Sequence, residues 1–366
     1  MDKCRSLAEE MTKDITKLRK SLAKKGISSP NANADVAKAM KKAGAKMRSR
    51  TPKGAIQVDK KALSTVRKPK KAKALAVEVL QARSRTRDRG GVLNIVKNSD
   101  GERVYPDLRM IGALTGRSSC ATPNLQQLNK HRGDGRVRGI MRAEKGHVIV
   151  AVDYNNIEIR TIAELSQDKK LISRLEDGLD VHSEVAEQVY GNYTPAQRNA
   201  VKAGIFAMLY GAGTETIADT AGCDYEEAMG IILSWEKLYP ATVKAGRMWI
   251  RKAERTGYAE YPNGWRPAVG KDSKGKVAGY RAKNYHVQGM AAFIFREGAR
   301  QLAFCTGYWK YVRMVVHDEF VLSVPKKRAE QILEEVVQAT TVIHPTMTYT
   351  TGGEIHGKYW GINRES

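Results

Sequence analysis

Two short apolar runs have the length and composition of buried β-strands. Residues 148–152 (VIVAV) are mostly β-branched, and this run ends at Asp153. From Ile157 the apolar positions recur at helical spacing, so a strand is expected to deliver Asp153 to the start of a helix. Residues 311–316 predict a second strand, and residues 320–324 predict a third.

The turn between the last two runs is unusual for a β-hairpin. It reads His317-Asp318-Glu319 and contains no glycine, whereas tight hairpin turns favour Asn-Gly or Asp-Gly. If Asp153 and Asp318 lay side by side, their charges would repel unless a cation lay between them. Such a pair is typical of two-metal phosphoryl transfer, which makes metal chemistry on a phosphate the leading hypothesis. For Asp153 alone, an ordinary helix cap is the plain alternative.

Helical spacing predicts much of the remaining chain. We expect helices over residues 2–25, 36–43, 62–89 (interrupted at Pro69), 195–210, 215–256, 284–304 and 327–339. Gly90 and Gly91 are expected to end the third of these, and residues 92–104 to form two strands joined by a turn. Residues 257–267 indicate another hairpin.

The helix predicted over residues 195–210 has two cations and two aromatic rings on one face. Spacing by four places them on a stripe about 18 Å long, formed by Arg198, Lys202, Phe206 and Tyr210. A triphosphate against the cations and a base stacked on the rings would explain this order. The plain alternative is an amphipathic helix with chance aromatics, because a separate apolar face is formed by Val201, Ile205 and Leu209.

Charge is concentrated at the start of the chain. The 366 residues have a formal net charge of +24, and residues 1–100 hold 27 Lys and Arg against 9 Asp and Glu, a surplus of 18. This favours a polyanionic partner, and nucleic acid over membrane, because no long apolar span or lipidation signal is present. The four cysteines form no C-x-x-C pair and we find no signal peptide, which indicates a reducing intracellular compartment.

Six segments, in this order along the chain, resemble the motifs of family A DNA polymerases. TGRSS with PNLQQL is similar to the family's TGRLSS and PNLQ, DYNNIEIR resembles motif A (DYSQIELR), and DVHSEVA resembles the D-x-H segment. RNAVKAGIFAMLYG resembles motif B, NYHVQGMAAF resembles N-x-P-x-QGTAAD, and VVHDEF resembles motif C (VHDE). The resemblance covers about residues 106–360 and, more loosely, the first hundred. It implies an α+β right-hand polymerase fold with a helical thumb, an antiparallel-sheet palm and helical fingers.

The chain departs from the family pattern beside these motifs. Asn155 and Asn156 replace Ser and Gln, which shortens an expected minor-groove contact. Tyr280, with Arg281 next to it, stands where an arginine is usual, and Asn, Gly, Thr and Asp are replaced by Ile205, Ala207, Met290 and Phe293. None of these changes removes a catalytic carboxylate, so they bear on fidelity and primer-terminus contacts.

The resemblance also implies a domain order. It places the thumb at 1–100, the palm at 101–166 and 261–366, and the fingers at 167–260. Ser29-Pro30-Asn31 and Thr51-Pro52-Lys53-Gly54 resemble the beginning of the family's thumb. Fewer than about 30 residues precede these segments, so neither an exonuclease nor a 5′ nuclease domain is expected ahead of them. We therefore expect a polymerase core, either naturally small or cut from a longer protein.

The family's residue roles transfer to matching positions. Asp153, Tyr154 and Asp318 would hold two Mg²⁺ ions, for which Mn²⁺ could substitute, with Glu319 in support. The dNTP would be bound by Arg198, Lys202, Phe206, Tyr210, Glu158, His182 and Asn156, where Glu158 excludes a 2′-hydroxyl and Lys202 protonates the leaving group. DNA would be contacted by Arg117, Asn124, Gln126, Tyr280, Arg281, Asn284, Gln288, His317, Lys68, Lys70, Lys71 and Lys73.

These expectations describe a template-directed DNA polymerase that extends a DNA primer with dNTPs by two-metal-ion nucleotidyl transfer and releases pyrophosphate. The expected partners are primer-template DNA and dNTPs, with a separate exonuclease or processivity factor as a further candidate and no membrane. A cytoplasmic location in a bacterium or a phage-infected cell is expected, and an organellar one is left open.

Two alternatives compete with this function. A single-subunit RNA polymerase would share the palm, but such enzymes lack a glutamate at the position of Glu158 and usually carry HDS in place of HDE. A non-catalytic DNA-binding subunit would have no need for the intact Asp153, Asp318, Arg198 and Lys202.

Overall fold

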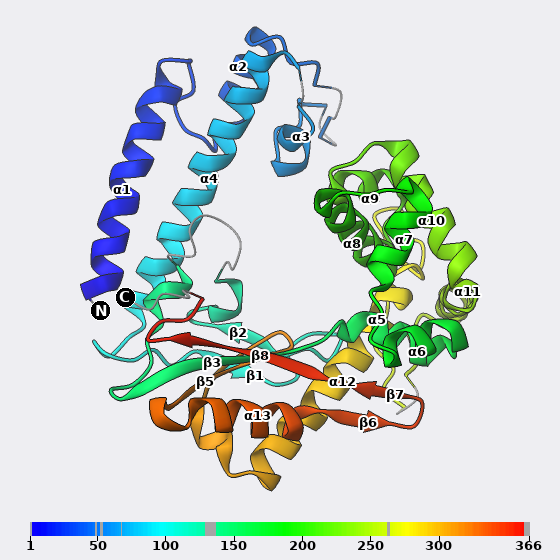
Figure 1. Ribbon diagram of the computed structural model, residues 1–366. Helices are drawn as coiled ribbons and strands as arrows, with labels where there is room; N and C mark the ends of the chain where they lie inside the picture. Colours follow the sequence, from blue (N-terminus) through cyan, green and yellow to red (C-terminus); the bar gives the residue numbers. More distant parts are fainter. Residues whose placement is uncertain are drawn as a thin grey trace. The chain divides into compact units, whose positions relative to one another are not determined.

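The chain folds into two units, which a computed structural model describes over residues 2–47, 50–51, 54–66, 68–128, 137–261 and 264–361. Unit 1 comprises Met1–Asp107 and Ala121–Ile140, and unit 2 comprises Leu108–Cys120 and Met141–Ser366. Helices combine with antiparallel sheets, so the predicted α+β class is confirmed (Figure 1). None of the helices described is both long and apolar enough to cross a membrane.

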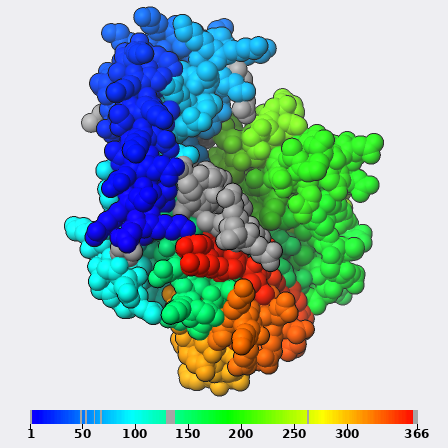
Figure 2. Space-filling view, turned by 60° about the vertical axis from the view of Figure 1, so that its left-hand side comes forward, coloured from blue at the N-terminus to red at the C-terminus, as the bar shows by residue number. Residues whose placement is uncertain are grey.

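Unit 1 is built from helices. Its elements are α1 (Asp2–Ala23), α2 (Asn33–Lys42), α3 (Lys60–Ser64), α4 (Lys70–Lys97) and the 3₁₀ helices η1 (Leu125–Gln127) and η2 (Arg138–Ile140). The long helices α1 and α4 pack along each other (Figure 1). A core between α1, α2, α3 and α4 contains the fully buried Leu22, Met40, Leu63 and Val79. Helix α1 is blue in Figure 2, and its Lys13, Lys17 and Lys20 are exposed.

The predicted end of a helix at Gly90 and Gly91 is wrong. Helix α4 continues through both glycines to Lys97, because Val92 and Ile95 are buried and extend its packed face. The two strands predicted over residues 92–104 are therefore wrong as well, although Ser99 and Val104 form an isolated antiparallel bridge. Tertiary packing here outweighs the helix propensity lost at two glycines, about 1 kcal/mol each.

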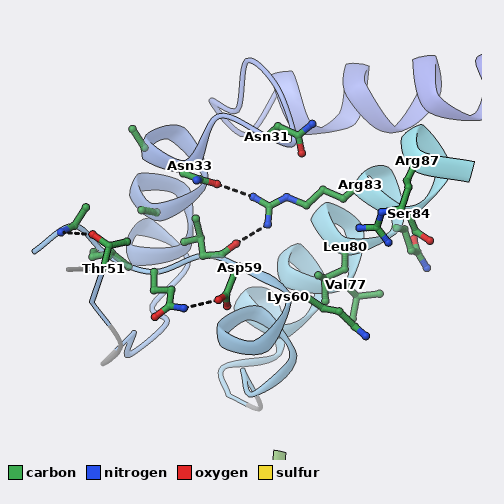
Figure 3. Close-up of a pocket in the computed structure, with 17 residues that line it drawn as sticks. Asn31, Asn33, Thr51, Asp59, Lys60, Val77, Leu80, Arg83, Ser84 and Arg87 are labelled. Carbon is green, nitrogen blue, oxygen red and sulfur yellow. Dashed lines mark hydrogen bonds between the residues drawn. The ribbon is translucent and has the colours of Figure 1, made fainter. Parts of the chain in front are cut away.

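Arg83 of α4 fastens the loops of unit 1 (Figure 3). Its guanidinium donates to the main-chain oxygens of Pro30 at 2.7 Å and Val58 at 2.5 Å, and to Oδ1 of Asn33 at 3.1 Å. It lies in the wall of a cavity of about 1110 Å³ bounded by α2, residues 55–60 and α4. Arg83 thus connects α4 to Asn33, which lies 50 residues earlier in the chain.

Unit 2 is organised around a four-stranded antiparallel sheet in the order β4-β5-β3-β8. Its strands are β3 (His147–Tyr154), β4 (Val312–Val316), β5 (Glu319–Pro325) and β8 (Thr351–Gly357). Helices α12 (Arg281–Cys305) and α13 (Ala329–Thr340) pack beneath it in Figure 1, and Phe295 stacks on Phe320 at 4.5 Å. The strands predicted on either side of His317-Asp318 and before Asp153 are therefore confirmed.

The green helices of Figure 1 form the rest of unit 2. They are α5 (Ile157–Ser166), α6 (Lys169–Glu176), α7 (Val181–Tyr190), α8 (Pro195–Leu209), α9 (Thr214–Ala221), α10 (Tyr225–Leu238) and α11 (Pro240–Thr256). The helical region predicted over 215–256 is divided where Gly222 adopts a φ of 72° and Asp224 caps the next helix. Pro240 then starts α11 at a position where its missing N–H costs nothing.

Several short elements complete the chain. They are the two-stranded sheets β1 (Asp107–Arg109) with β2 (Ser119–Ala121) and β6 (Val342–His344) with β7 (Met347–Tyr349), and the 3₁₀ helices η3 (Tyr308–Tyr311) and η4 (Lys326–Arg328). The predicted hairpin over 257–267 is represented by an antiparallel bridge between Tyr258 and Ala268, and its residues 262–263 lie outside the described residues.

Candidate active site

Three acidic residues meet where β3 and β5 pair. Asp153 is the penultimate residue of β3, and its partner across the ladder is Glu319, the first residue of β5. Asp318 belongs to the two-residue turn between β4 and β5. The sheet register therefore brings together two segments separated by more than 150 residues of sequence.

The surroundings of Asp318 suit a bound cation. Burial raises the pKa of its carboxyl group, and the charges of Asp153 and Glu158 raise it further, while Arg117 acts in the opposite direction. Bringing a divalent cation to these carboxylates would offset their repulsion. Among the described residues, no group of three or more His, Cys, Asp or Glu side chains is arranged to hold a metal ion. Two carboxylates with water and substrate oxygens are the ligand set usual for Mg²⁺.

Tyr154 differs from its predicted place among the metal ligands. Its phenol is buried and donates to the main-chain oxygen of Thr340 at 2.6 Å. Only the main chain of Tyr154 is therefore available beside Asp153. The phenol instead joins β3 to the end of α13, and it packs so closely on Gly298 that a Cβ there would overlap its oxygen.

Two of the predicted site residues have backbone dihedrals in the left-handed region. His317 has a φ of 59° at the first position of the hairpin turn, and Asn156 has a φ of 50° just before α5. His and Asn adopt this region more readily than most residues with a side chain. The turn thus forms without glycine because His317 supplies the required dihedral, and strain of this kind concentrates at functional sites.

Glu158 is buried and accepts hydrogen bonds from two other side chains. One of its oxygens, Oε1, accepts from Nη2 of Arg117 at 2.6 Å and from the hydroxyl of Tyr210 at 2.9 Å. Burial and the charge of Glu158 raise the pKa of Tyr210, so the phenol keeps the proton that it donates. Arg117 is therefore paired with Glu158 in this structure, and its predicted contact with DNA stays a prediction.

The stripe predicted on α8 continues onto α7. The ring of Phe206 lies 5.9 Å from that of His182 and 6.5 Å from that of Tyr210, measured between centroids. The opposite, apolar face of the helix is buried as predicted, with at most 1 % of the surface of each residue exposed at Val201, Ile205 and Leu209. Helix α8 thus buries one face, while Lys202 is exposed and Phe206 is half-buried and packs partly against the same core.

Arg198 forms an ion pair that the sequence did not suggest. Its Nε donates to Asp180 at 2.6 Å and to Ser183 at 3.2 Å. Burial would raise the pKa of Asp180, but the hydrogen bonds from Arg198 and Ser183 outweigh it and lower the pKa to about 2. Asp180 also caps α7 by accepting from the backbone N–H of His182 at 3.1 Å.

His182 is buried and uncharged. Its exposed fraction is 1 %, and neither ring nitrogen has a partner among the described residues. Burial, together with the charge of Lys202, lowers its pKa to about 4. A neutral imidazole offers a hydrogen bond but no charge, and the role of His182 in binding the dNTP stays a prediction. Lys202 is exposed on α8 and remains available as a cation.

The predicted DNA-contacting residues are divided between the units. Unit 2 contains Arg117, Tyr280, Arg281, Asn284, Gln288 and His317, and unit 1 contains Asn124, Gln126, Lys68, Lys70, Lys71 and Lys73. The four lysines are exposed around the start of α4. Asn124 caps η1 through the backbone N–H of Gln126 at 3.1 Å, and Gln126 is buried.

Helix α12 contributes three of the predicted residues. Oδ1 of Asn284 is buried without a partner in the described structure, as expected of a group that meets a ligand. Gln288 follows one turn later and is half-buried. Arg281 instead donates to the main-chain oxygen of Val269 at 2.9 Å, which assigns it a structural bond, while its neighbour Tyr280 is 48 % exposed.

Two residues at the site were missed by sequence reasoning. Asp180 pairs with Arg198, and its signal was available as the first residue of the D-x-H segment. Arg296 of α12 donates to the main-chain oxygen of Gly116 at 2.5 Å and thereby supports the loop that bears Arg117. No local pattern marked Arg296, because its partner lies 180 residues away.

Comparison with known proteins agrees with this geometry. A family model described as DNA polymerase family A matches residues 1–350. The DNA polymerase of Mycobacterium phage D29 is 28 % identical over 342 residues, which is 92 % of this chain and 55 % of that protein. The thermostable DNA polymerase I of Thermus aquaticus is 33 % identical over 260 residues, 66 % of this chain and 30 % of that protein.

A solved structure shares the fold. The POL domain of Pol1 from M. smegmatis, in complex with DNA primer-template and dNTP, superposes with a TM-score of 0.84 at 22 % identity. The match covers 98 % of this chain and 66 % of that one. The chain therefore spans between about a third and about half of the length of the two curated relatives above.

Proposed function

Since the chain belongs to DNA polymerase family A, we propose that it is a template-directed DNA polymerase that extends a DNA primer with dNTPs and releases pyrophosphate. The observation that carries this proposal is the meeting of Asp153 and Asp318 at the end of β3 and in the β4–β5 turn. The complex named for the M. smegmatis structure supports primer-template DNA and dNTP as the partners.

Asp153 and Asp318 would hold two Mg²⁺ ions, with Mn²⁺ as a substitute and Glu319 beside them. When bound, such ions activate the primer 3′-hydroxyl and neutralise charge on the triphosphate. The main chain of Tyr154 lies next to this pair. Because the carboxylates occupy a strand end and a strained two-residue turn, their positions are set by the sheet and not by a mobile loop.

Arg198 and Lys202 would bind the triphosphate, and Lys202 would donate a proton to the leaving pyrophosphate. Arg198 now pairs with Asp180, but both side chains are about a third exposed, at 32 % and 39 %. An ion pair that is this exposed contributes little free energy of stabilisation. A polyanionic triphosphate could therefore displace Asp180 from the guanidinium of Arg198. His182, with two unpartnered nitrogens among the described residues, would add a neutral hydrogen bond.

Phe206 and Tyr210 would form the wall of the nascent base pair, and Glu158 would exclude the 2′-hydroxyl of a ribonucleotide. The hydrogen bonds from Arg117 and Tyr210 hold the Glu158 carboxylate in one position. Asn156 would lie next to the incoming nucleotide, and Asn284, Gln288 and His317 would contact the primer-template end.

The subdomain boundaries are also proposals. We assign the thumb to residues 1–100, the palm to 101–166 and 261–366, and the fingers to 167–260. The helical character of unit 1 and the placement of the large sheet within unit 2 support this order. A separate exonuclease or processivity factor is a further candidate partner.

Primer extension tests the proposed function. The unmodified chain is expected to extend a labelled primer on a template with dNTPs and Mg²⁺, and Asp153→Ala or Asp318→Ala is expected to abolish extension while duplex binding stays nearly intact. Glu330→Ala, which removes an exposed carboxylate of α13, serves as the matched control and should retain activity. Substantial activity in either aspartate variant would refute the two-metal assignment.

A further inference from the structure

Lys283 of α12 is a half-buried lysine whose ammonium group lies at the last turn of α8. Its Nζ donates to the main-chain oxygen of Met208 at 2.8 Å. The aliphatic stem lies over Gly246 of α11, where an added Cβ would be 3.3 Å from Cε of Lys283. Burial lowers the pKa of Lys283 to about 8, and the charge of Glu236 offsets only part of this effect.

Lys283 forms no ion pair with any of the described residues. Glu236 of α10, the acid whose charge reaches Lys283, is itself paired with Arg247 at 3.4 Å. An ammonium group that is partly removed from water and has no carboxylate partner is costly unless other groups stabilise it. The carbonyl of Met208 and the negative end of the α8 dipole supply that stabilisation. Lys283 therefore caps the C-terminus of α8 from a different helix.

The cap lies next to the residues that face the nucleotide site. Met208 is two residues after Phe206 and two before Tyr210, whose hydroxyl reaches Glu158 at 2.9 Å. One residue further, Gly211 has a φ of 85°, and an added Cβ there would lie 3.1 Å from the main-chain oxygen of Tyr280. The start of α12 thus meets the end of α8 at two points.

We propose that Lys283 is a positioning residue that fixes the last turn of α8, and with it the Tyr210–Glu158 contact that discriminates deoxyribose from ribose. The inference rests on the proposed polymerase function for its consequence, because sugar selection matters only if nucleotides bind there. Its structural part, the tie between α12 and α8, stands without that function.

Hydrogen exchange tests the tie directly. In Lys283→Met, which keeps an unbranched stem as far as Cε and removes the donor, the amides at the end of α8 are expected to exchange about 10-fold faster. Lys244→Met makes the same replacement at an exposed position of α11 and should leave that segment unchanged. Equal protection in the two variants would overturn the inference, whether or not the chain proves to be a polymerase.

Sugar selection tests the consequence. The ratio of kcat/KM for dNTP to that for NTP is expected to fall about 10-fold in Lys283→Met, mainly through a higher KM for dNTP, and to recover in part in Lys283→Arg. A variant with lower activity but an unchanged ratio would reduce Lys283 to a purely structural role and refute the proposal. Failure of the unmodified chain to extend any primer would instead refute the proposed function.

A second variant covers the case in which Lys283→Met does not fold. Gly246→Ala keeps the lysine and places a methyl group 3.3 Å from Cε of Lys283, so that the stem must move by a few tenths of an ångström. The same faster exchange at the end of α8 and the same lower sugar ratio are expected. Unchanged values of both would count against the proposal.

Discussion

At the scale of single residues, the site is governed by which donors reach each buried acid. Glu158 is 9 % exposed and shares one carboxylate oxygen between Arg117 and Tyr210. A carboxylate held by two donors has little freedom to move away from an approaching 2′-hydroxyl, and its remaining oxygen is acceptor-only. Rejection of a ribonucleotide would then follow from crowding, because the held carboxylate cannot move aside for the additional oxygen.

Replacing Glu158 by alanine should therefore weaken sugar discrimination. We expect the ratio of catalytic efficiencies for dNTP and NTP on one primer-template to fall by at least about 10-fold, with some loss of dNTP activity because Tyr210 loses its acceptor. Glu187→Ala, at an exposed position on α7, is the control and should keep the ratio. A ratio already near one in the unmodified chain would revive the RNA polymerase alternative.

At the scale of elements, helix α4 shows how packing decides where a helix ends. Gly90 and Gly91 lie inside the helix without positive φ, and an added Cβ at either would meet no atom within 4 Å. Glycine loses more conformational entropy on folding than other residues do, and the folded helix needs no glycine at these two positions. By contrast, Gly26 follows α1 with a φ of 79°, a conformation that disfavours any side chain.

Alanine at these glycines should accordingly have opposite effects. Gly90→Ala and Gly91→Ala are each expected to raise the free energy of unfolding by roughly 0.5–1 kcal/mol, through helix propensity and a less flexible unfolded chain. Gly26→Ala, the same replacement in the same unit with equal open space, should lower it by about 1 kcal/mol. Urea denaturation measures all three, and a destabilised Gly90→Ala would mean that α4 is not a continuous helix there.

At the scale of the whole molecule, the distribution of charge is the dominant feature. Of the net charge of +24, a surplus of 18 falls within residues 1–100, which lie in unit 1. Among these, Lys68, Lys70, Lys71 and Lys73 are exposed side by side around the start of α4. Clustered lysines are suited to bind DNA phosphates, and such contacts do not depend on the base sequence of the DNA.

Neutralising these four lysines together should weaken primer-template binding and its salt dependence. For every lysine that binds a phosphate in the unmodified chain, the slope of log K against log salt is expected to become shallower by roughly 0.9. The control replaces four exposed lysines of unit 2 in the same way, namely Lys169, Lys237, Lys326 and Lys327. If both sets changed the slope equally, net charge and not a particular surface would explain binding.

The sequence by itself determined the class of fold, the strands around Asp153 and Asp318 and the buried face of helix α8. Each of these depends on features repeated along a short stretch, such as β-branched runs, four-residue spacing and motifs in a set order, and family membership follows from the same motifs. Local patterns survive folding when burial agrees with them. The subdomain boundaries and the residue roles stay predictions.

Only the tertiary structure decided the partners of the charged side chains. Arg117 meets Glu158 across 41 residues of sequence, and Lys283 meets the carbonyl of Met208 across 75. Packing likewise buried His182 and carried α4 past its glycines. The physical reason is common to all: pairing, burial and pKa depend on groups within a few ångströms, and sequence spacing does not report which distant segments the core brings that close.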